Sequence, residues 1–229
     1  VATSRTIALP QQNQIVEKIT VVESDLFIAK ISSFFGGSLI SFKIKNHLLF
    51  DSSFVNLITS ENQDNMVISF KNLDGEIVDL KNGWSSLQSV DSLYLNSEPF
   101  TVKHENSFDN KKITKTITLY PDEFLIDVEI DMSELSENTL ANNFSLNWSG
   151  GLPPTEQDTV SEQAFFGAYL FQGGELLDVK VGSGESFNNN YKGQTDWVAT
   201  RSKYFVVSFL DNVGNQITGS SVAASFDKN

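Results

Sequence analysis

The chain has 229 residues and no cysteine, which excludes disulfide bonds and thiolate chemistry. Its 29 acidic and 16 basic residues give a formal net charge of −13, which disfavours nucleic acid and anionic membrane surfaces as partners. No run reaches the roughly 18 to 20 apolar residues of a membrane helix, and no signal peptide opens the sequence. We therefore interpret the chain as a soluble segment whose export or anchoring signals lie outside it.

Residues 1–20 are polar at their start and are predicted to form an N-terminal arm or linker. Residues 21–229 are predicted to form one β-sandwich domain, because apolar and polar residues alternate with the period of two that is typical of strands. Gly36-Gly37 separates two apolar runs and predicts a turn with positive φ. The second run alternates at Ile40, Phe42 and Ile44.

Two further alternating segments each run into a turn. Met66–Phe70 precedes Asp74-Gly75, a dipeptide that favours a tight hairpin. Ile113–Leu119 precedes Pro121-Asp122, which favours a turn as well.

The most regular strand pattern covers Phe124–Met132, in which every second residue is apolar. Asp127, Glu129 and Asp131 occupy the alternate positions. Such a strand has one face on a core and the other in water, as in an antiparallel sheet.

The C-terminal part of the chain continues the β pattern. Phe144–Trp148 alternates again, and Val198–Leu210 is predicted to be one long strand. Ser161–Phe171 suits a short helix, a strand or a loop equally well. With roughly ten or more strands and almost no helix, the sequence predicts an all-β sandwich.

Catalytic or metal-binding side chains are scarce. His47 and His104 are the only histidines, and neither a His-x-His nor a His-x₃-His spacing, as expected of a metal site, occurs. Both lie beside strands among polar neighbours, so we expect them at the surface or at sheet edges. The sequence therefore predicts no catalytic, cofactor-binding or metal-ligating residues, and it leaves the ligand- or partner-binding residues unknown.

Carboxylates suggest two alternative sites, and both are better explained structurally. Asp127, Glu129 and Asp131 could be imagined as a glycosidase pair, but such a pair must flank one bond from two directions. Three carboxylates on one strand face are instead expected to be solvated. Asp211–Asn215 surrounds a glycine with oxygen donors but lacks the spacing of an EF-hand loop, so a hairpin turn is predicted.

The tryptophans Trp84, Trp148 and Trp197 could stack on sugars, but two of them lie in strand-like patterns, where core packing is the default. We predict that Trp197 is largely buried at the start of a strand. Its expected packing partners are Phe205 or Phe209.

Four stretches, taken in chain order, resemble one known family. They are "SDLFIAKISSFFGGSLISFKIKNH" (24–47), "KKITKTITLYPDEFLIDVEIDM" (111–132), "FSLNWSGGLPPTEQDT" (144–159) and "DWVATRSKYFVVSF" (196–209). The family is the large periplasmic domain of YidC, the bacterial inner-membrane protein insertase. The resemblance covers roughly residues 20–210.

The resemblance implies a twisted antiparallel β-supersandwich of the galactose-mutarotase-like type, on the periplasmic side of the bacterial inner membrane. It implies a non-catalytic accessory role without cofactors, with contacts to Sec translocon components or emerging membrane proteins. No residue of the family is carried over for that contact. The family's domain usually continues through further strands and a terminal helix, so its last strands are expected either to lie beyond Asn229 or to be divergent in this chain.

Two alternatives use the same sandwich: a carbohydrate-binding or sugar-modifying protein, and a structural surface protein. The insertase interpretation predicts about 20 apolar residues just before Val1 in the full-length gene. It also predicts no sugar epimerase activity, because that reaction needs a positioned acid and base, for which only His47 and His104 are available.

Overall fold

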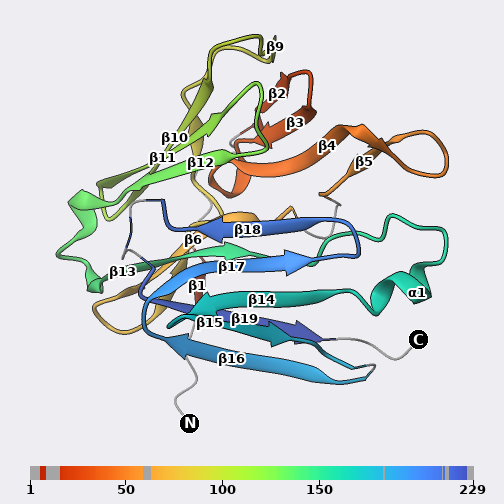
Figure 1. Ribbon diagram of the computed structural model, residues 1–229. Coiled ribbons are helices and arrows are strands. Elements are labelled where there is room, and N and C mark those ends of the chain that lie inside the picture. The colour runs from red at the N-terminus through yellow and green to blue at the C-terminus, as the bar shows by residue number, and fades with distance from the viewer. Residues whose placement is uncertain are drawn as a thin grey trace. The chain divides into compact units, whose positions relative to one another are not determined.

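The computed structural model describes residues 6–8, 16–58, 63–182, 184–212, 214 and 217–225 (Figure 1). Within these ranges the chain is mostly β-strand, with one α-helix of five residues, α1 (Thr159–Gln163), and two 3₁₀ turns. The predicted all-β class, built of several antiparallel sheets, is confirmed. The chain divides into two compact units, Val1–Gly150 and Gly151–Asn229. The prediction of an arm over 1–20 and one domain over 21–229 stays a prediction.

The first unit contains three sheets, with strand orders β1–β7–β6–β13, β5–β4–β3–β2–β9 and β12–β11–β10–β8. Its strands are β1 (Thr6–Ala8), β2 (Ile19–Glu23), β3 (Phe27–Ser32), β4 (Ser38–Leu48), β5 (Phe54–Asn56), β6 (Asn65–Asn72), β7 (Ile77–Asp79), β8 (Ser85–Ser86), β9 (Ser92–Tyr94), β10 (Phe100–Phe108), β11 (Lys111–Leu119), β12 (Ile126–Asp131) and β13 (Thr139–Trp148). Among the described strands of this unit, neighbours pair antiparallel except β1–β7 and β2–β9.

The second unit contains two sheets, with orders β15–β14–β17–β18 and β16–β19. Its strands are β14 (Gly167–Gln172), β15 (Glu175–Val179), β16 (Ser186–Lys192), β17 (Thr195–Arg201), β18 (Val206–Leu210) and β19 (Gly219–Ser225). All pairings between these strands are antiparallel.

One hydrophobic cluster of the first unit lies between the β6–β7 sheet and the β10–β11 sheet. Its buried members are Ile68, Phe70, Val78, Leu80, Trp84, Ile113 and Leu135. Trp84 is enclosed, and its indole N–H donates to the Leu80 carbonyl oxygen at 2.6 Å. Trp84 is therefore a core residue, as the default interpretation predicted. Burying each large apolar side chain of this kind contributes about 1.5–3 kcal/mol.

The predicted turns are confirmed. Gly36 and Gly37 have φ of 75° and 81° and connect β3 to β4. A Cβ on Gly37 would lie 2.7 Å from the His104 ring, so a side chain does not fit there. Asp74-Gly75 closes the β6–β7 hairpin, where the Gly75 N–H donates to the Asn72 carbonyl oxygen at 3.0 Å. Pro121 lies in the turn between β11 and β12.

The regular strand predicted over Phe124–Met132 is shorter in the structure. Pairing with β11 begins at Ile126, opposite Leu119, and ends at Asp131. Phe124 is 51% exposed, so its predicted place on the core face is wrong. The reason is that Phe124 precedes the first paired residue and belongs to the turn connection.

The long strand predicted over Val198–Leu210 is also wrong. The chain turns back after Arg201, and β17 and β18 form a hairpin with Arg201 opposite Val206. The ambiguous segment Ser161–Phe171 divides between the end of α1 and the first part of β14.

The second unit has a smaller core between its two sheets. Leu170, Val179 and Val222 are its buried members. Trp197 is partly buried at the start of β17, and its indole stacks on the Phe171 ring, with centroids 6.1 Å apart. The predicted place at a strand start is confirmed, but the stacking partner is one that the sequence did not indicate.

Candidate functional site

Two of the sequence motifs that carried the family resemblance meet in the second unit. The β17–β18 turn, residues 202–205, is closed by a hydrogen bond from the Ser202 N–H to the Phe205 carbonyl oxygen at 2.9 Å. Ser202 is buried, and its hydroxyl accepts the Phe205 N–H at 3.3 Å. This small buried anchor holds the turn while Lys203 and Tyr204 point outward, with Tyr204 57% exposed.

The facing loop belongs to the 144–159 motif and is organised by a buried carboxylate. Glu162 in α1 accepts hydrogen bonds from the Thr155 N–H at 2.7 Å, the Thr155 hydroxyl at 3.0 Å and the Glu156 N–H at 2.8 Å. Asp158 caps α1 by accepting the Ser161 N–H at 3.0 Å, as an N-cap side chain does. The loop therefore holds Glu156 in a fixed position.

Glu156 joins the two motifs. Its carboxylate accepts a hydrogen bond from the Tyr204 hydroxyl and lies 3.5 Å from the Lys203 ammonium. The ammonium also lies over the Phe165 and Tyr204 rings, 5.8 and 4.8 Å from their centroids. We call Glu156, Phe165, Lys203 and Tyr204 the Lys203 cluster.

The electrostatics of the Lys203 cluster favour the charged forms of both partners. The Tyr204 hydrogen bond, and then the Lys203 charge, lower the pKa of Glu156. Hydrogen bonding with Tyr204, and then the charges of Tyr204 and Glu156, raise the pKa of Lys203. Within the Lys203 cluster, no nucleophile lies beside a base.

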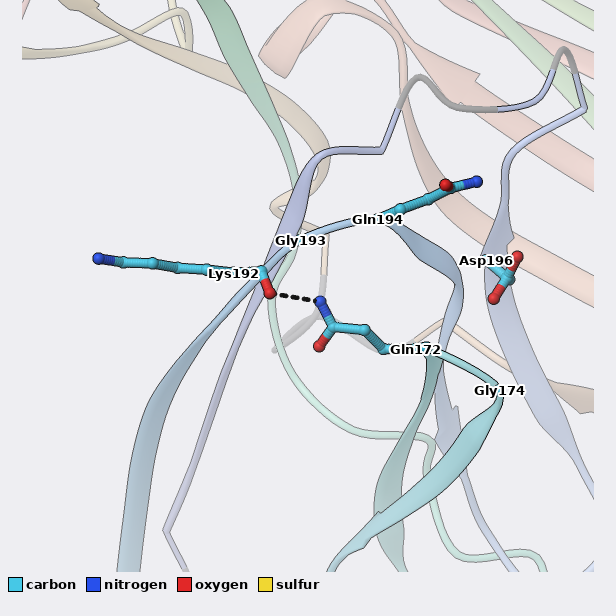
Figure 2. Close-up of a pocket in the computed structure, with 7 residues that line it drawn as sticks. Gln172, Gly174, Lys192, Gly193, Gln194 and Asp196 are labelled. Carbon is cyan, nitrogen blue, oxygen red and sulfur yellow. Dashed lines mark hydrogen bonds between the residues drawn. The ribbon is translucent and has the colours of Figure 1, made fainter.

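A shallow pocket of about 350 Å³ lies in the second unit, between the β14–β15 turn and the connection from β16 to β17 (Figure 2). Its lining residues are Gln172, Gly173, Gly174, Lys192, Gly193, Gln194 and Asp196. The Gln172 side-chain amide donates to the Lys192 carbonyl oxygen at 2.8 Å. Figure 2 shows the Lys192 side chain extending away from Asp196, so the pocket lacks a converging pair of charges.

The histidines occupy different environments. His47 is exposed near the end of β4, as predicted. His104 is 1% exposed within β10, so its predicted surface position is wrong. The physical reason is parity: His104 shares a strand face with Val102, and that face packs on the core.

A buried lysine lies directly opposite His104. Lys115 in β11 is the register partner of His104 and is fully buried. Its ammonium donates to the carbonyl oxygens of Met66 at 2.5 Å and Gly37 at 3.4 Å. The sequence carries a signal for this burial, because Lys115 alternates in phase with the buried Ile113.

Burial lowers the pKa of both His104 and Lys115. Desolvation, with a second contribution from the Lys115 charge, lowers the pKa of His104 to about 4. Desolvation lowers the pKa of Lys115 to about 7. Among the described residues, His104 Nδ1 has no hydrogen-bond partner. The pair is enclosed, so it does not face a ligand at the surface.

The structure also places the remaining candidate residues. Asp127, Glu129 and Asp131 lie along β12, where Glu129 and Asp131 are exposed as predicted and Asp127 is partly buried. Asp211 accepts the Gly214 N–H at 2.9 Å in a turn. The predicted hairpin is nevertheless wrong, because the flanking strands β18 and β19 belong to different sheets. Val213 and Asn215 lie outside the described residues. Trp148, at the end of β13, is partly buried.

In the parts of the chain that the structure describes, no three His, Asp or Glu side chains gather as a metal site would require. Among the same residues, no helix has the length and apolar character that crossing a membrane demands.

The sequence profile of the YidC periplasmic domain matches residues 19–226. The chain is 31% identical over 203 residues to the membrane protein insertase YidC of Chlorobaculum parvum, with 85% of this chain and 34% of that protein covered. It is 30% identical over 196 residues to the protein of the same name from Chlorobium phaeovibrioides, with coverages of 83% and 33%. The Chlorobaculum tepidum relative is 29% identical over 201 residues, with coverages of 85% and 33%. The chain thus spans about a third of the length of these relatives.

Proposed function

The chain belongs to the YidC periplasmic domain family, and from this premise we propose that it is a non-catalytic accessory domain of a bacterial membrane protein insertase. Its place is the periplasmic side of the inner membrane, between membrane segments outside this chain. Its role is to assist insertion and folding of inner-membrane proteins by contacting Sec translocon components or emerging substrate.

The observation that supports the proposal is the family match over residues 19–226. The matched relatives carry the printed name of membrane protein insertase, and the chain corresponds to only about a third of their length. In this proposal, the membrane-embedded steps of insertion belong to the other two thirds of the protein, because no helix in the described residues of this chain could cross a membrane. Contact with a partner is therefore the role left to this domain.

We assign partner contact to the Lys203 cluster. Tyr204 and Phe165 are 57% and 43% exposed, although both are large aromatic side chains. Tyrosine is one of the residues enriched in interface hot spots. The buried Ser202 and Glu162 anchor both loops, so the surface needs little reordering when it binds.

Site-specific photo-crosslinking in the full-length insertase tests this assignment. A photo-reactive residue at Tyr204 is expected to crosslink to a translocon component or to a stalled membrane-protein substrate. The control is the same residue at Leu73, which is 64% exposed in the β6–β7 turn of the first unit. Equal crosslinking from both positions would contradict the assignment, whereas loss of insertion on deleting residues 19–226 tests the accessory role separately.

The alternative is a sugar-modifying or carbohydrate-binding protein on a mutarotase-like fold. His104 is enclosed in the first unit and its pKa is lowered to about 4, which does not suit a surface acid–base pair near neutral pH. Polarimetry with fresh α-glucose and α-galactose is expected to show no acceleration by the chain. Acceleration that disappears in His47→Ala would favour the enzyme instead.

A further inference from the structure

Strand β12 is the end strand of the sheet β12–β11–β10–β8. Figure 1 shows β10, β11 and β12 running side by side in the first unit. β12 pairs with β11 over six consecutive residues without a register shift, from Leu119 opposite Ile126 to Thr114 opposite Asp131. Among the described strands, β11 is its only hydrogen-bonded neighbour. The outer backbone N–H and C=O groups of β12 therefore form a regular open row.

The two faces of β12 differ sharply. Ile130 packs against the core of the first unit, and Ile126 and Val128 share its parity and remain partly exposed. The opposite face carries Asp127 and Glu129, followed by a third carboxylate at Asp131. An added strand would meet an apolar row on one face and an acidic row on the other.

Such an edge is a template for strand addition unless something blocks it. Natural proteins block edges with charged side chains, proline, bulges or very short strands. Over its six paired residues β12 has no proline and no bulge, and its only device of this kind is the charge of Asp127, Glu129 and Asp131. Phe124 and Leu125, 51% and 43% exposed, add apolar surface at the point where the edge begins.

The carboxylates determine which chain the edge accepts. Two copies of β12 side by side would bring like charges together, which is unfavourable across strands, so the acidic row opposes self-pairing. Opposite charges across strands attract. On β11, the residues directly opposite these carboxylates are uncharged. Asp127, Glu129 and Asp131 pair with Thr118, Thr116 and Thr114.

The three carboxylates are not equally committed to other contacts. Asp127 accepts the Tyr120 hydroxyl at 2.5 Å. Asp131 accepts the Ser133 N–H at 3.0 Å, and this hydrogen bond is the main cause that lowers its pKa. Glu129 is exposed in the middle of the acidic row. Its partner on β11 is Thr116, and the partner of Thr116 on β10 is Lys103, so this lysine lies two strands away from Glu129. Glu129 is therefore the carboxylate best placed to meet a cation on an added strand.

We propose that β12 is a strand-addition site for an extended polypeptide segment in which Lys or Arg alternates with apolar residues. Backbone hydrogen bonds to the open edge provide the affinity, and the alternating charges provide the selectivity, as in other cases of β-augmentation. The cationic side chains face Asp127, Glu129 and Asp131, and the apolar ones extend the row of Ile126 and Val128. The site lies in the first unit and is independent of the partner contact assigned to the Lys203 cluster.

Binding of short peptides to the 229-residue chain tests the proposal. The probe is a fluorescent Lys-Val-Lys-Ile-Lys-Val-Lys peptide, followed by anisotropy in low salt. Saturable binding is expected, with amide exchange slowed at residues 126–131. The same peptide with Glu in place of Lys is expected to bind at least about tenfold more weakly, and added salt should weaken the cationic peptide.

Two variants separate the β12 edge from the overall charge of the chain. Glu129→Lys is expected to weaken binding about tenfold. Glu98→Lys makes the same change in net charge at an exposed loop residue between β9 and β10 and is expected to leave binding unchanged. Equal loss in both variants would show a non-specific charge effect and overturn the proposal.

Backbone pairing is tested with N-methylated peptides. Only every second N–H of an added strand points toward the edge, so one alternating set of N-methyl groups should abolish binding and the other should not. Equal binding of both sets would mean that no strand is added. No saturable binding up to millimolar peptide, or equal binding of the Glu peptide, would also overturn the proposal.

Discussion

Lys115 in the first unit and Lys203 in the second unit are the same kind of side chain in opposite surroundings. Lys115 is fully buried and donates to the carbonyl oxygens of Met66 and Gly37. Lys203 is partly exposed and pairs with Glu156. Desolvation lowers the pKa of Lys115 to about 7, whereas the partners of Lys203 raise its pKa.

Lys115 is buried because it donates to backbone carbonyl oxygens inside the fold, whereas Lys203 pairs with a side chain at the surface. Met66 has φ of 57° and falls where the β6–β13 register shifts, between the pairs Asn65–Trp148 and Val67–Asn147. Its carbonyl oxygen is buried and needs a donor, which the Lys115 ammonium supplies. A surface lysine has no such task, so Lys203 organises charges and rings at the surface instead. Buried polar groups in this protein thus maintain the fold, and exposed ones present a surface.

The largest expected effect is the dependence of the free energy of unfolding on pH that results from burying Lys115. Lys115 loses its proton at about pH 7 in the folded chain but near 10.5 in the unfolded chain, so the unfolded state binds more protons between these values. Stability relative to Lys115→Met should therefore rise by about 1.4 kcal/mol per pH unit from pH 7 to 10.5, and fall again as the pH is lowered. Urea unfolding of both proteins across this range measures it. A constant difference would mean that Lys115 is solvated.

His104 should give the same slope of unfolding free energy against pH, but over the narrower acidic range from pH 4 to 6.5. Its pKa is about 4 when folded and 6.5 when unfolded, so the unfolded state again binds more protons and stability is lost as pH falls from 6.5 to 4. The loss, about 1.4 kcal/mol per pH unit, should be absent in His104→Leu. It should be smaller in Lys115→Met, because the Lys115 charge contributes to the shift. An unchanged acid midpoint in His104→Leu would contradict the prediction.

In the second unit, Trp197→Ala should cost about 2 kcal/mol, below the range for fully buried aromatic residues, because Trp197 is only partly buried. A double-mutant cycle with Phe171→Ala should give a coupling of about 0.5–1.5 kcal/mol for the stacked rings. Thermal or urea unfolding measures both. A coupling near zero would show that the two rings pack independently.

The smallest expected effect on stability is that of the Lys203 ion pair. Lys203→Met and Glu156→Gln should each leave the unfolding midpoint within experimental error, because exposed ion pairs contribute little. Lys115→Met, by contrast, is expected to change the free energy of unfolding by an amount that depends on pH. A large loss of stability from either change would show that the pair supports the fold, and would weaken its assignment as a contact surface.

Much of the fold could be predicted from the sequence because it depends on local chemistry. Alternation identified the strands around Ile113 and Phe144, since a strand with one wet face must alternate. Gly36-Gly37 and Asp74-Gly75 identified turns, because positive φ and tight hairpins favour those residues. The four motifs identified the family, which the profile match over residues 19–226 confirms.

Other features depended on contacts between distant residues, which alternation does not record. The pattern through Val198–Leu210 looks like one strand, and only the buried Ser202 and its bond to Phe205 reverse the chain. Equally, nothing local to Glu156 indicates that Tyr204, far along the chain, will donate to it.

The sequence by itself determined the all-β class, several of the turns and the family, because strand period, turn chemistry and motif order are properties of neighbouring residues. Only the tertiary structure decided that Lys115 and His104 are buried, since two sheets must close over one face before a charge loses its water. It likewise decided that β12 is an edge strand, because a strand is an edge only when it pairs on one side, and among the described strands β12 pairs with β11 alone.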